Sequence, residues 1–318
     1  MKTFVAGATG AVGRRLVPRL VANGHEVVGT TRSPEKVEAL RALGAEPVVL
    51  DVLDAEAVGR AVSEAAPEVV VHQATALSEL GSMRNLDKEF RETNRLRTAG
   101  TDNLLAAARA VEAKTFVAQS FAGWPYAKEG GWVKDESAPL DESPPATAAA
   151  SMAAIRHLEA AVEDVDGIEG IVLRYGGFYG PGTSLAEGGA FLEPIRKRQF
   201  PIVGSGAGMW SFVHIDDVAG ATLAAIERGR RGVYNVVDDE PAPAADWMPY
   251  LAELLGAKPP RHVPEWLGRL LAGELFVLMM TEARGASNAK AKRELGWKPI
   301  HPSWREGFAS MLQLPIAA

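Results

Sequence analysis

Short apolar runs alternate with amphipathic stretches along the first 180 residues of this chain. Six runs have the length and composition of strands, and they are TFVA at 3–6, EVVGTT at 26–31, EPVVL at 46–50, EVVVHQATAL at 68–77, TFVAQS at 115–120 and GIVLRY at 170–175. Apolar residues recur at helical spacing between them, as in 34–43, 89–111 and 151–165. This alternation predicts an α/β fold with a doubly wound, parallel, Rossmann-type sheet.

The pattern changes after Gly182. Residues 202–229 read as an extended segment, a turn, a short strand and a helix, and RGVYNVV at 231–237 predicts a seventh strand. The rest of the chain is mostly helical, with breaks expected at Pro249, Pro259 and Pro264.

These patterns predict two domains. Residues 1–180, joined by the strand near 232–238, form a nucleotide-binding Rossmann domain. Residues 181–231 and 239–318 form a small, mostly helical substrate-binding domain.

The turn between the first strand and a helix that begins near Ala11 is rich in glycine. Such spacing allows a tight turn, close approach of the backbone to a pyrophosphate and close packing of the helix on the strand. The helix then presents its free N–H groups and positive dipole end to the anion. The predicted pyrophosphate contacts are Gly7, Thr9, Gly10, Ala11, Val12 and Gly13. A glycine-rich structural turn is the alternative.

The end of the second strand favours NADP(H) over NAD(H). An NAD-binding fold of this type places an acidic residue there, whereas this chain has Thr31 followed by Arg32. Arg32, Ser33 and Lys36 would suit a 2′-phosphate. Solvated surface charge at a helix start is the alternative interpretation.

Small and polar residues follow the next strands. Asp51 is expected to reach the adenine amino group with Val52 beside the ring, or to cap the helix that begins near Ala55. The cofactor is also expected to lie across the ends of the fourth and fifth strands, which carry Gln73, Ala74, Thr75 and Gln119. His72 is expected to be structural.

Composition and charge exclude several classes of function. The formal net charge is −6 without a basic block, which argues against a nucleic-acid partner. The chain has no cysteine, and its six histidines show no metal-ligand spacing, so no metal is expected. Met1 leads directly into the first strand without a signal peptide, and 266–280 reads as one buried or partner-facing helix, too short for a bilayer. A cytosolic protein acting on a small molecule is expected.

Several motifs together resemble the NAD(P)-dependent epimerase/dehydratase branch of the extended short-chain dehydrogenase/reductase superfamily. They are GATGAVG at 7–13, LDVLD at 50–54, VLRYGGFYGPG at 172–182, SFVHIDDVA at 211–219, VYNVVD at 233–238 and ELGWKP at 294–299. The resemblance implies an NAD(P) cofactor and a C-terminal substrate-binding region. By analogy alone, a homodimer through two long helices is one expected assembly.

The chain departs from that family at the catalytic pair Tyr-x-x-x-Lys. Alignment on Glu159 puts Ser151 at the tyrosine position and Ile155 at the lysine position, and no tyrosine lies between Tyr126 and Tyr175. The favoured hypothesis is an atypical NADPH-dependent ketoreductase of a bulky aromatic substrate, similar to tyrosine-less ketoreductases of aromatic polyketide pathways. Its proton would come from Ser120, Ser151, Tyr175, water or the substrate. A nucleotide-sugar epimerase or dehydratase and a non-catalytic NADP(H) sensor are the alternatives.

Further roles are assigned to individual residues. Phe121, Trp124, Phe178 and Trp210 are predicted to line an apolar substrate pocket, with ordinary core as the alternative. Tyr175 resembles the family position beside the nicotinamide, where it would position the ring. Asn94 is expected to support the site, Asp216 and Asp217 to cap a helix, and Arg284 to reach toward substrate or cofactor.

Overall fold

A seven-stranded parallel sheet forms the centre of the computed structural model, which describes residues 1–77 and 84–312. The strand order is β12-β7-β5-β4-β1-β2-β3. The strands are β1 (Lys2–Ala6), β2 (Glu26–Thr31), β3 (Glu46–Val49), β4 (Val69–His72), β5 (Thr115–Phe121), β7 (Glu169–Tyr175) and β12 (Gly232–Val236). The order reverses between β1 and β4, so the crevice beyond their carboxyl ends is the expected ligand site.

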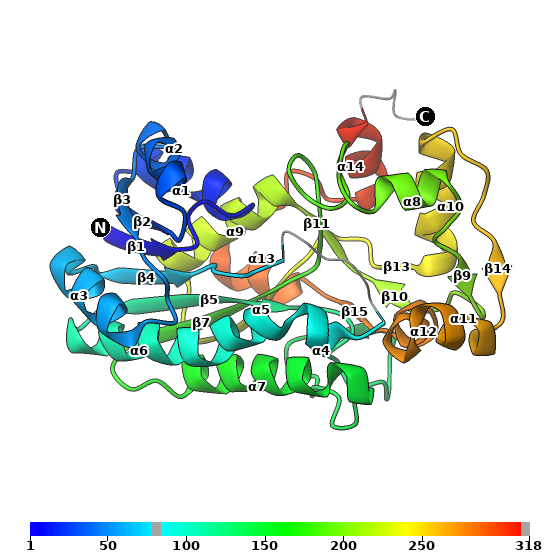
Figure 1. The fold of residues 1–318 in the computed structure, drawn as a ribbon, viewed down its shortest axis with the longest axis horizontal. Helices are drawn as coiled ribbons and strands as arrows, with labels where there is room; N and C mark the ends of the chain where they lie inside the picture. The colour runs from blue at the N-terminus through cyan, green and yellow to red at the C-terminus, as the bar shows by residue number, and fades with distance from the viewer. Residues whose placement is uncertain (78–83, 313–318) are drawn as a thin grey trace.

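Helices cover both faces of this sheet (Figure 1), which confirms the predicted doubly wound α/β fold. One face carries α1 (Gly13–Ala22), α2 (Val37–Ala42), α9 (Ile215–Arg228) and α13 (Ala289–Leu295). The other carries α3 (Ala55–Ala65), α6 (Thr101–Ala110) and α7 (Ala149–Glu163). The strands read as continuous apolar runs because both of their faces are buried.

The remaining elements form a second lobe beside the strand ends (Figure 1). Its helices are α8 (Leu192–Arg196), α10 (Ala244–Leu254), α11 (Glu265–Ala272), α12 (Glu274–Thr281) and α14 (Trp304–Met311). Short strand pairs connect it: β8 (Gly177–Tyr179) with β11 (Phe212–His214), β10 (Met209–Trp210) with β13 (Ala242–Pro243), β9 (Ile202–Val203) with β14 (His262–Val263), and β6 (Val133–Lys134) with β15 (Gly285–Ala286). Because α9 and α13 pack on the large sheet, the predicted substrate-binding region contributes to the nucleotide-binding lobe as well. The division into two domains stays a prediction.

The segment predicted as one helix over 89–111 is composite. It consists of α4 (Leu86–Glu89), α5 (Arg91–Arg95), a π-helical turn η2 (Leu96–Gly100) and α6. Two 3₁₀ turns, η1 (Pro34–Lys36) and η3 (Ala146–Ala148), precede α2 and α7. A π-helical turn inside a helix often marks a functional site.

Two predictions in the C-terminal region were wrong. Pro249 does not break a helix but lies inside α10, where the buried side chains of Met248 and Leu251 hold both adjoining turns in the core. The segment 266–280 is two helices, because Gly273 with φ 90° separates α11 from α12. The breaks at Pro259 and Pro264 are confirmed, since α10 ends before the first and α11 begins after the second. In the described ranges, every helix is too short or too polar to cross a membrane.

Candidate active site

The loop between β1 and α1 brings its backbone close to the end of β4. A Cβ atom added to Gly7, whose φ is 85°, would lie 2.7 Å from the Ala74 nitrogen, and one added to Gly13 would lie 2.4 Å from the Ala8 carbonyl oxygen. Only glycine fits there. In the first turn of α1, the N–H groups of Arg14 and Arg15 donate to the Gly10 and Val12 carbonyls, whereas those of Ala11, Val12 and Gly13 make no hydrogen bond among the described residues and can face an anion. The cradle fits a dinucleotide pyrophosphate, and the role of its residues stays a prediction.

The residues expected near the adenosine ribose lie at the carboxyl end of β2. Thr31 accepts a hydrogen bond from the Ser33 N–H at 3.1 Å. The Arg32 guanidinium lies 3.5 Å from a carboxylate oxygen of Glu92, and both side chains are exposed. Lys36 is also exposed. These cations are free to turn toward a 2′-phosphate, with Glu92 as a competing partner for Arg32.

Asp51 does not cap the helix after β3, so that interpretation was wrong. Asp54 does so, because its Oδ1 accepts the Ala57 N–H at 3.0 Å. Asp51 is exposed, three residues further from the helix, whereas Val52 is only 3% exposed and packs in the core. The adenine contacts assigned to both stay predictions.

Gln73, at the end of β4, is oriented by a buried chain of hydroxyl groups. Its amide nitrogen donates to the Tyr175 hydroxyl at 3.0 Å. The Thr222 hydroxyl donates to the Val218 carbonyl at 2.7 Å, so the Tyr175 proton points at Thr222, 2.8 Å away. Burial raises the pKa of Tyr175 to about 12. Tyr175 is therefore placed to position Gln73 rather than to supply a proton.

The other amide atom of Gln73 is available to a ligand. Its Oε1 is buried and has no hydrogen-bond partner among the described residues. A buried acceptor without a partner is costly. A nicotinamide amide or a ribose hydroxyl would satisfy it. The partly exposed residues Ala74, Thr75 and Gln119 adjoin the same strand ends.

His72 has the environment of a structural histidine. Its Nε2 lies 3.0 Å from the Leu96 carbonyl oxygen, and the ring is only 2% exposed. Burial lowers the pKa of His72 to about 4, so the ring is neutral at neutral pH and donates to that carbonyl.

Ser151, predicted to stand at the position of the family tyrosine, is held by two polar side chains. Its Oγ donates to Asp87 Oδ1 at 2.7 Å and accepts from the Asn94 amide at 3.0 Å. Asp87 also accepts the backbone N–H groups of Ala150 and Ser151, which fixes the first turn of α7. Asn94 thus supports Ser151. The single Ser151 proton points at a carboxylate, an arrangement that does not favour the predicted role as proton donor.

Ser120 is part of a buried ion pair. It donates to Glu159 Oε1 at 2.6 Å, and Arg174 binds both oxygens of the same carboxylate at 2.8 and 2.7 Å. The Ser120 proton is directed into this network, which favours a structural role over the predicted catalytic one. A charge-assisted, bidentate pair of this kind fixes the orientation of α7 on β7.

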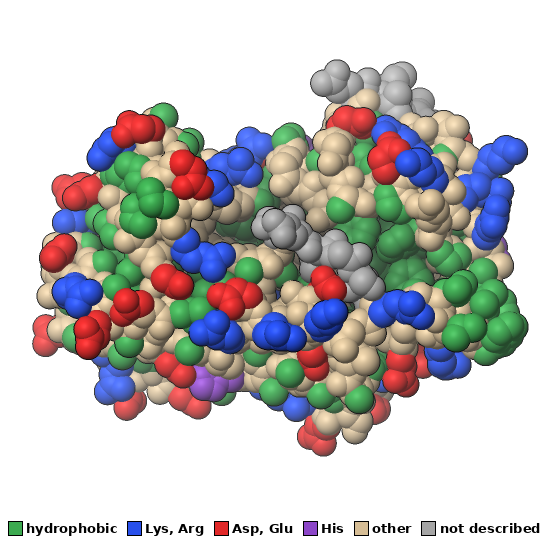
Figure 2. All heavy atoms as spheres, in the orientation of Figure 1, with side chains coloured by type: hydrophobic (Ala, Val, Ile, Leu, Met, Phe, Trp, Pro, Cys, Tyr) green, Lys and Arg blue, Asp and Glu red, His purple; other side chains and the backbone are tan. Residues whose placement is uncertain are grey.

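Three of the four aromatic residues predicted to bind substrate come together. Phe121, Trp124 and Trp210 pack with Met152 and Ile155 in one apolar cluster between the two lobes. Figure 2 shows the molecule hollowed between the lobes, with hydrophobic side chains on the wall of the hollow. Phe121, Trp124 and Trp210 therefore form part of the apolar core, and their role in binding substrate stays a prediction.

Phe178 lies elsewhere: it packs on the nucleotide-binding sheet, with its ring 5.6 Å from that of Tyr175. Arg284 is tied to nearby backbone, because its guanidinium donates to the carbonyls of Glu282 and Lys128 and stacks on Trp132. These bonds hold Arg284 against nearby backbone, but its Nε is buried without a hydrogen-bond partner among the described residues, and its reach toward substrate or cofactor stays a prediction.

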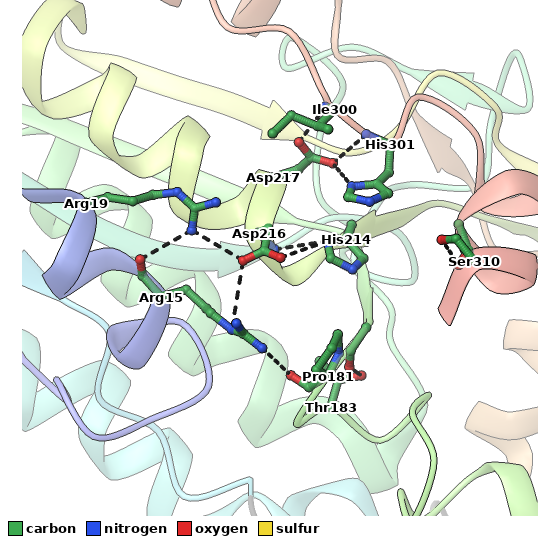
Figure 3. A network of polar contacts seen from close by, with 12 residues as sticks. Arg15, Arg19, Pro181, Thr183, His214, Asp216, Asp217, Ile300, His301 and Ser310 are labelled. Carbon is green, nitrogen blue, oxygen red and sulfur yellow. Dashed lines mark hydrogen bonds and ion pairs between the residues drawn. The ribbon is translucent and has the colours of Figure 1, made fainter. Parts of the chain in front are cut away.

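Asp216 and Asp217 do not cap α9 with their side chains, which corrects the sequence-based expectation. The N-cap is His214, whose Nδ1 accepts the Asp216 N–H at 3.2 Å. Asp216 instead pairs with Arg15 and Arg19 of α1, as Figure 3 shows. Each carboxylate joins segments that are far apart in sequence, which a local pattern does not reveal.

The same network brings three groups of a kind that bind metals together. His214, Asp217 and His301 offer atoms within 4.8 Å of one another (Figure 3). However, the two rings lie face to face, 3.8 Å apart and 30° from parallel, so their in-plane lone pairs do not converge. Asp217 also accepts the backbone N–H groups of Ile300 and His301 at 2.6 and 2.9 Å. The cluster is suited to docking the C-terminal segment on α9.

Sequence reasoning missed Asp87 and Arg97. Asp87 lies 64 positions before Ser151 and has no motif around it. Arg97 lies in the helical segment 89–111, where arginine is ordinarily a surface residue, yet it is 7% exposed. An arginine amid helix-forming residues gives no signal of burial without the tertiary structure.

Comparisons with known proteins identify the family and the fold. The sequence model of the NAD dependent epimerase/dehydratase family matches residues 3–237. A 3-diazoavenalumate denitrifying reductase of a Streptomyces species is 47% identical over 97% of this chain and 99% of its own. A 4-hydroxy-2-methyl-3-oxo-4-farnesyl-3,4-dihydroquinoline-1-oxide ketoreductase of Stigmatella aurantiaca is 30% identical over 93% and 92%. The crystal structure of a Thermotoga maritima UDP-glucose 4-epimerase superposes with a TM-score of 0.76 at 25% identity, covering 98% of both chains.

Proposed function

This chain belongs to the NAD-dependent epimerase/dehydratase family and is an oxidoreductase, and from that premise we propose that it is an NADPH-dependent reductase of an aromatic diazo compound. Hydride passes from the dihydronicotinamide to the ring carbon that carries the diazo group. The C–H bond forms, the C–N bond breaks, and dinitrogen leaves with the electrons of that bond. The products are the arene, dinitrogen and NADP⁺.

The observation that carries this proposal is that Ser151 donates its proton to Asp87 and that an apolar residue, Ile155, lies one turn further along α7. The family tyrosine is replaced by a serine that donates to Asp87, and the family lysine by Ile155. Reduction of an ordinary ketone needs a proton donor for the developing alkoxide. Displacement of dinitrogen by hydride needs none, so positioning by the cofactor cradle and the aromatic cluster supplies the catalysis.

Reduction of a phenolic ketone is the second candidate. The 30% identical relative is named a ketoreductase, and the cluster of Phe121, Trp124 and Trp210 suits a bulky ring system. In such a substrate a neighbouring phenol hydrogen-bonds to the carbonyl and assists the proton transfer.

NADPH is preferred in this proposal because Thr31 occupies the position where an acidic residue would repel a 2′-phosphate. Arg32 and Lys36 are the cations within reach of that phosphate.

The test is to follow reduced-nicotinamide absorbance with purified protein and NADPH against a 3-diazo-4-hydroxycinnamate, a phenolic ketone and UDP-glucose. We expect NADPH consumption with the diazo compound, release of one dinitrogen per NADPH, and transfer of deuterium from labelled NADPH to the ring carbon. A reaction without enzyme controls for direct reduction by the cofactor.

The other outcomes distinguish the alternative functions from one another. Consumption with the ketone alone would establish the second candidate. Conversion of UDP-glucose without net NADPH consumption would indicate an epimerase. Tight NADPH binding with no turnover of any substrate would indicate a sensor.

A further inference from the structure

Arg97 is a buried arginine without an ionic partner among the residues that the structure describes. It is 7% exposed and takes part in no hydrogen bond or ion pair within 1–77 and 84–312, and its contact of note is with the ring of Phe90, 5.8 Å from its guanidinium carbon. Burial lowers the pKa of Arg97 to about 10, so it stays charged at neutral pH. An unpaired buried charge destabilises a fold. Its retention points to a ligand.

The position of Arg97 directs it toward the predicted catalytic position. One turn earlier, Thr93 accepts the Ala76 N–H from the loop after β4, and Asn94 donates to Ser151 on α7. Residues three and four apart share a face of a helix, and helical side chains point back toward the N-terminus. The Arg97 guanidinium therefore extends from the turn η2 over the gap between these two contacts, toward Phe90.

Phe90 lies between Arg97 and the aromatic cluster that is proposed to bind substrate. It packs against the cluster that contains Phe121, Trp124 and Ile155, the residue at the family lysine position. Two titratable groups interact electrostatically with Arg97: His72 of β4, which is neutral, and Glu159 of α7, which is already bound at both oxygens by Arg174. No nearby carboxylate is free to take the Arg97 charge among these groups.

We propose that Arg97 binds the anionic oxygen of the aromatic substrate, the phenolate or carboxylate, at the cofactor end of the aromatic cluster. This inference rests on the proposed function and deepens it. Negative charge gathers on the ring oxygen as hydride reaches a diazo-phenol or a phenolic ketone. A fixed cation in a water-poor site stabilises that charge in the transition state.

The test compares Arg97→Met and Arg97→Lys with Arg95→Met, a matched control on an exposed arginine that pairs with Glu92. The measurements are the Kd of NADPH, the melting temperature, and the Kd of 4-hydroxycinnamate and of cinnamamide in the presence of NADP⁺. We expect Arg97→Met to weaken 4-hydroxycinnamate binding by at least about 30-fold, as loss of a buried charge pair does. The Kd values of neutral cinnamamide and of NADPH should differ from those of the parent protein by less than about threefold.

The melting temperature separates binding from structure. Because Arg97→Met removes an unpaired buried charge, the variant should melt at the same temperature as the parent or higher, and Arg97→Lys should restore part of the binding. A fall in melting temperature with unchanged 4-hydroxycinnamate binding would assign Arg97 a structural role. A parallel loss of NADPH affinity would assign it to the cofactor ribose or phosphates. Both results would overturn the proposal.

These binding measurements require no turnover. If the parent protein reduces no substrate, the proposed function fails, while the comparison of 4-hydroxycinnamate with cinnamamide still decides whether Arg97 holds an anionic oxygen.

Discussion

At the scale of single residues, the role of each polar group around the site depends on the hydrogen bonds that it already makes as well as on its residue type. Ser120 and Ser151 have hydroxyls that suit proton transfer, but each proton faces a carboxylate. Tyr175 has a phenol, but its proton faces Thr222. Among the described residues, Gln73 Oε1 and Asn94 Oδ1 are buried without a hydrogen-bond partner, and the Arg97 guanidinium makes no hydrogen bond or ion pair. Unpaired buried groups are the better indicators of ligand binding.

Ser151→Ala should retain activity within about threefold, because in the proposed reaction no protein acid contributes the factor of about 100 or more that such groups give. Loss of its bonds to Asp87 and Asn94 should lower the free energy of unfolding by about 1–2 kcal/mol. Steady-state kinetics and urea unfolding measure the two effects, with the exposed Ser137→Ala as control. A hundredfold drop in kcat would restore Ser151 as the acid.

Asp238 should make stability fall as pH rises. Burial raises the pKa of Asp238 to about 8, and its Oδ2 has no partner within the described residues. The folded state therefore holds a proton that the unfolded state has already lost above pH about 4, so unfolding becomes easier as pH rises toward 8. Urea unfolding between pH 6.5 and 8.5 should show this slope, of at most about 1.4 kcal/mol per pH unit. Asp238→Asn should flatten it; an equal slope in the variant would contradict the assignment.

At the scale of elements, local sequence patterns predict a loop or a helix end correctly where backbone geometry alone determines it. The glycine loop is an example: Gly7 and Gly13 are required by contacts with backbone atoms. Helix breaks at proline succeed at Pro264 and fail at Pro249, where tertiary packing of α10 outweighs a cost of about 3 kcal/mol. The turn η2 and the cap of α7 by Asp87 depend on distant contacts and have no local signal.

Gly13→Ala should destabilise the protein and abolish cofactor binding, because the added methyl group would lie 2.4 Å from the Ala8 carbonyl oxygen. Gly59→Ala is the matched control, since a Cβ atom there meets nothing within 4 Å inside α3. It should stabilise the fold by about 0.5–1 kcal/mol. Thermal unfolding and NADPH titration of both variants test the contrast. Equal behaviour would mean that the loop shifts to accommodate the methyl group.

At the scale of the whole molecule, we expect the cofactor to bind across the ends of the sheet and the loop after β4, next to the second lobe. NADPH at 100 times its Kd should stabilise the fold by about 2.7 kcal/mol, through its preference for the folded state. Arg32→Gln should weaken NADPH binding by about tenfold, through loss of one phosphate contact, and leave NADH binding unchanged. Calorimetric titration and melting curves with each nucleotide measure this. Equal effects on both nucleotides would contradict the assignment of Arg32 to the 2′-phosphate.

The sequence by itself determined the sheet, and it is the basis for the predictions of a pyrophosphate cradle and of a missing family tyrosine. Apolar runs and glycine spacing are local properties of the sequence. Because local backbone preferences depend on them, they are enough to predict β1, the loop after it and α1. Only the tertiary structure decided which polar groups are hydrogen-bonded within the protein and which can still bind a ligand. Ser151 meets Asp87 across 64 positions, and Arg97 lies buried without a hydrogen-bond or ionic partner in the described part of the chain. Such pairings depend on how helices from separate parts of the chain pack together, and no short stretch of sequence contains that information.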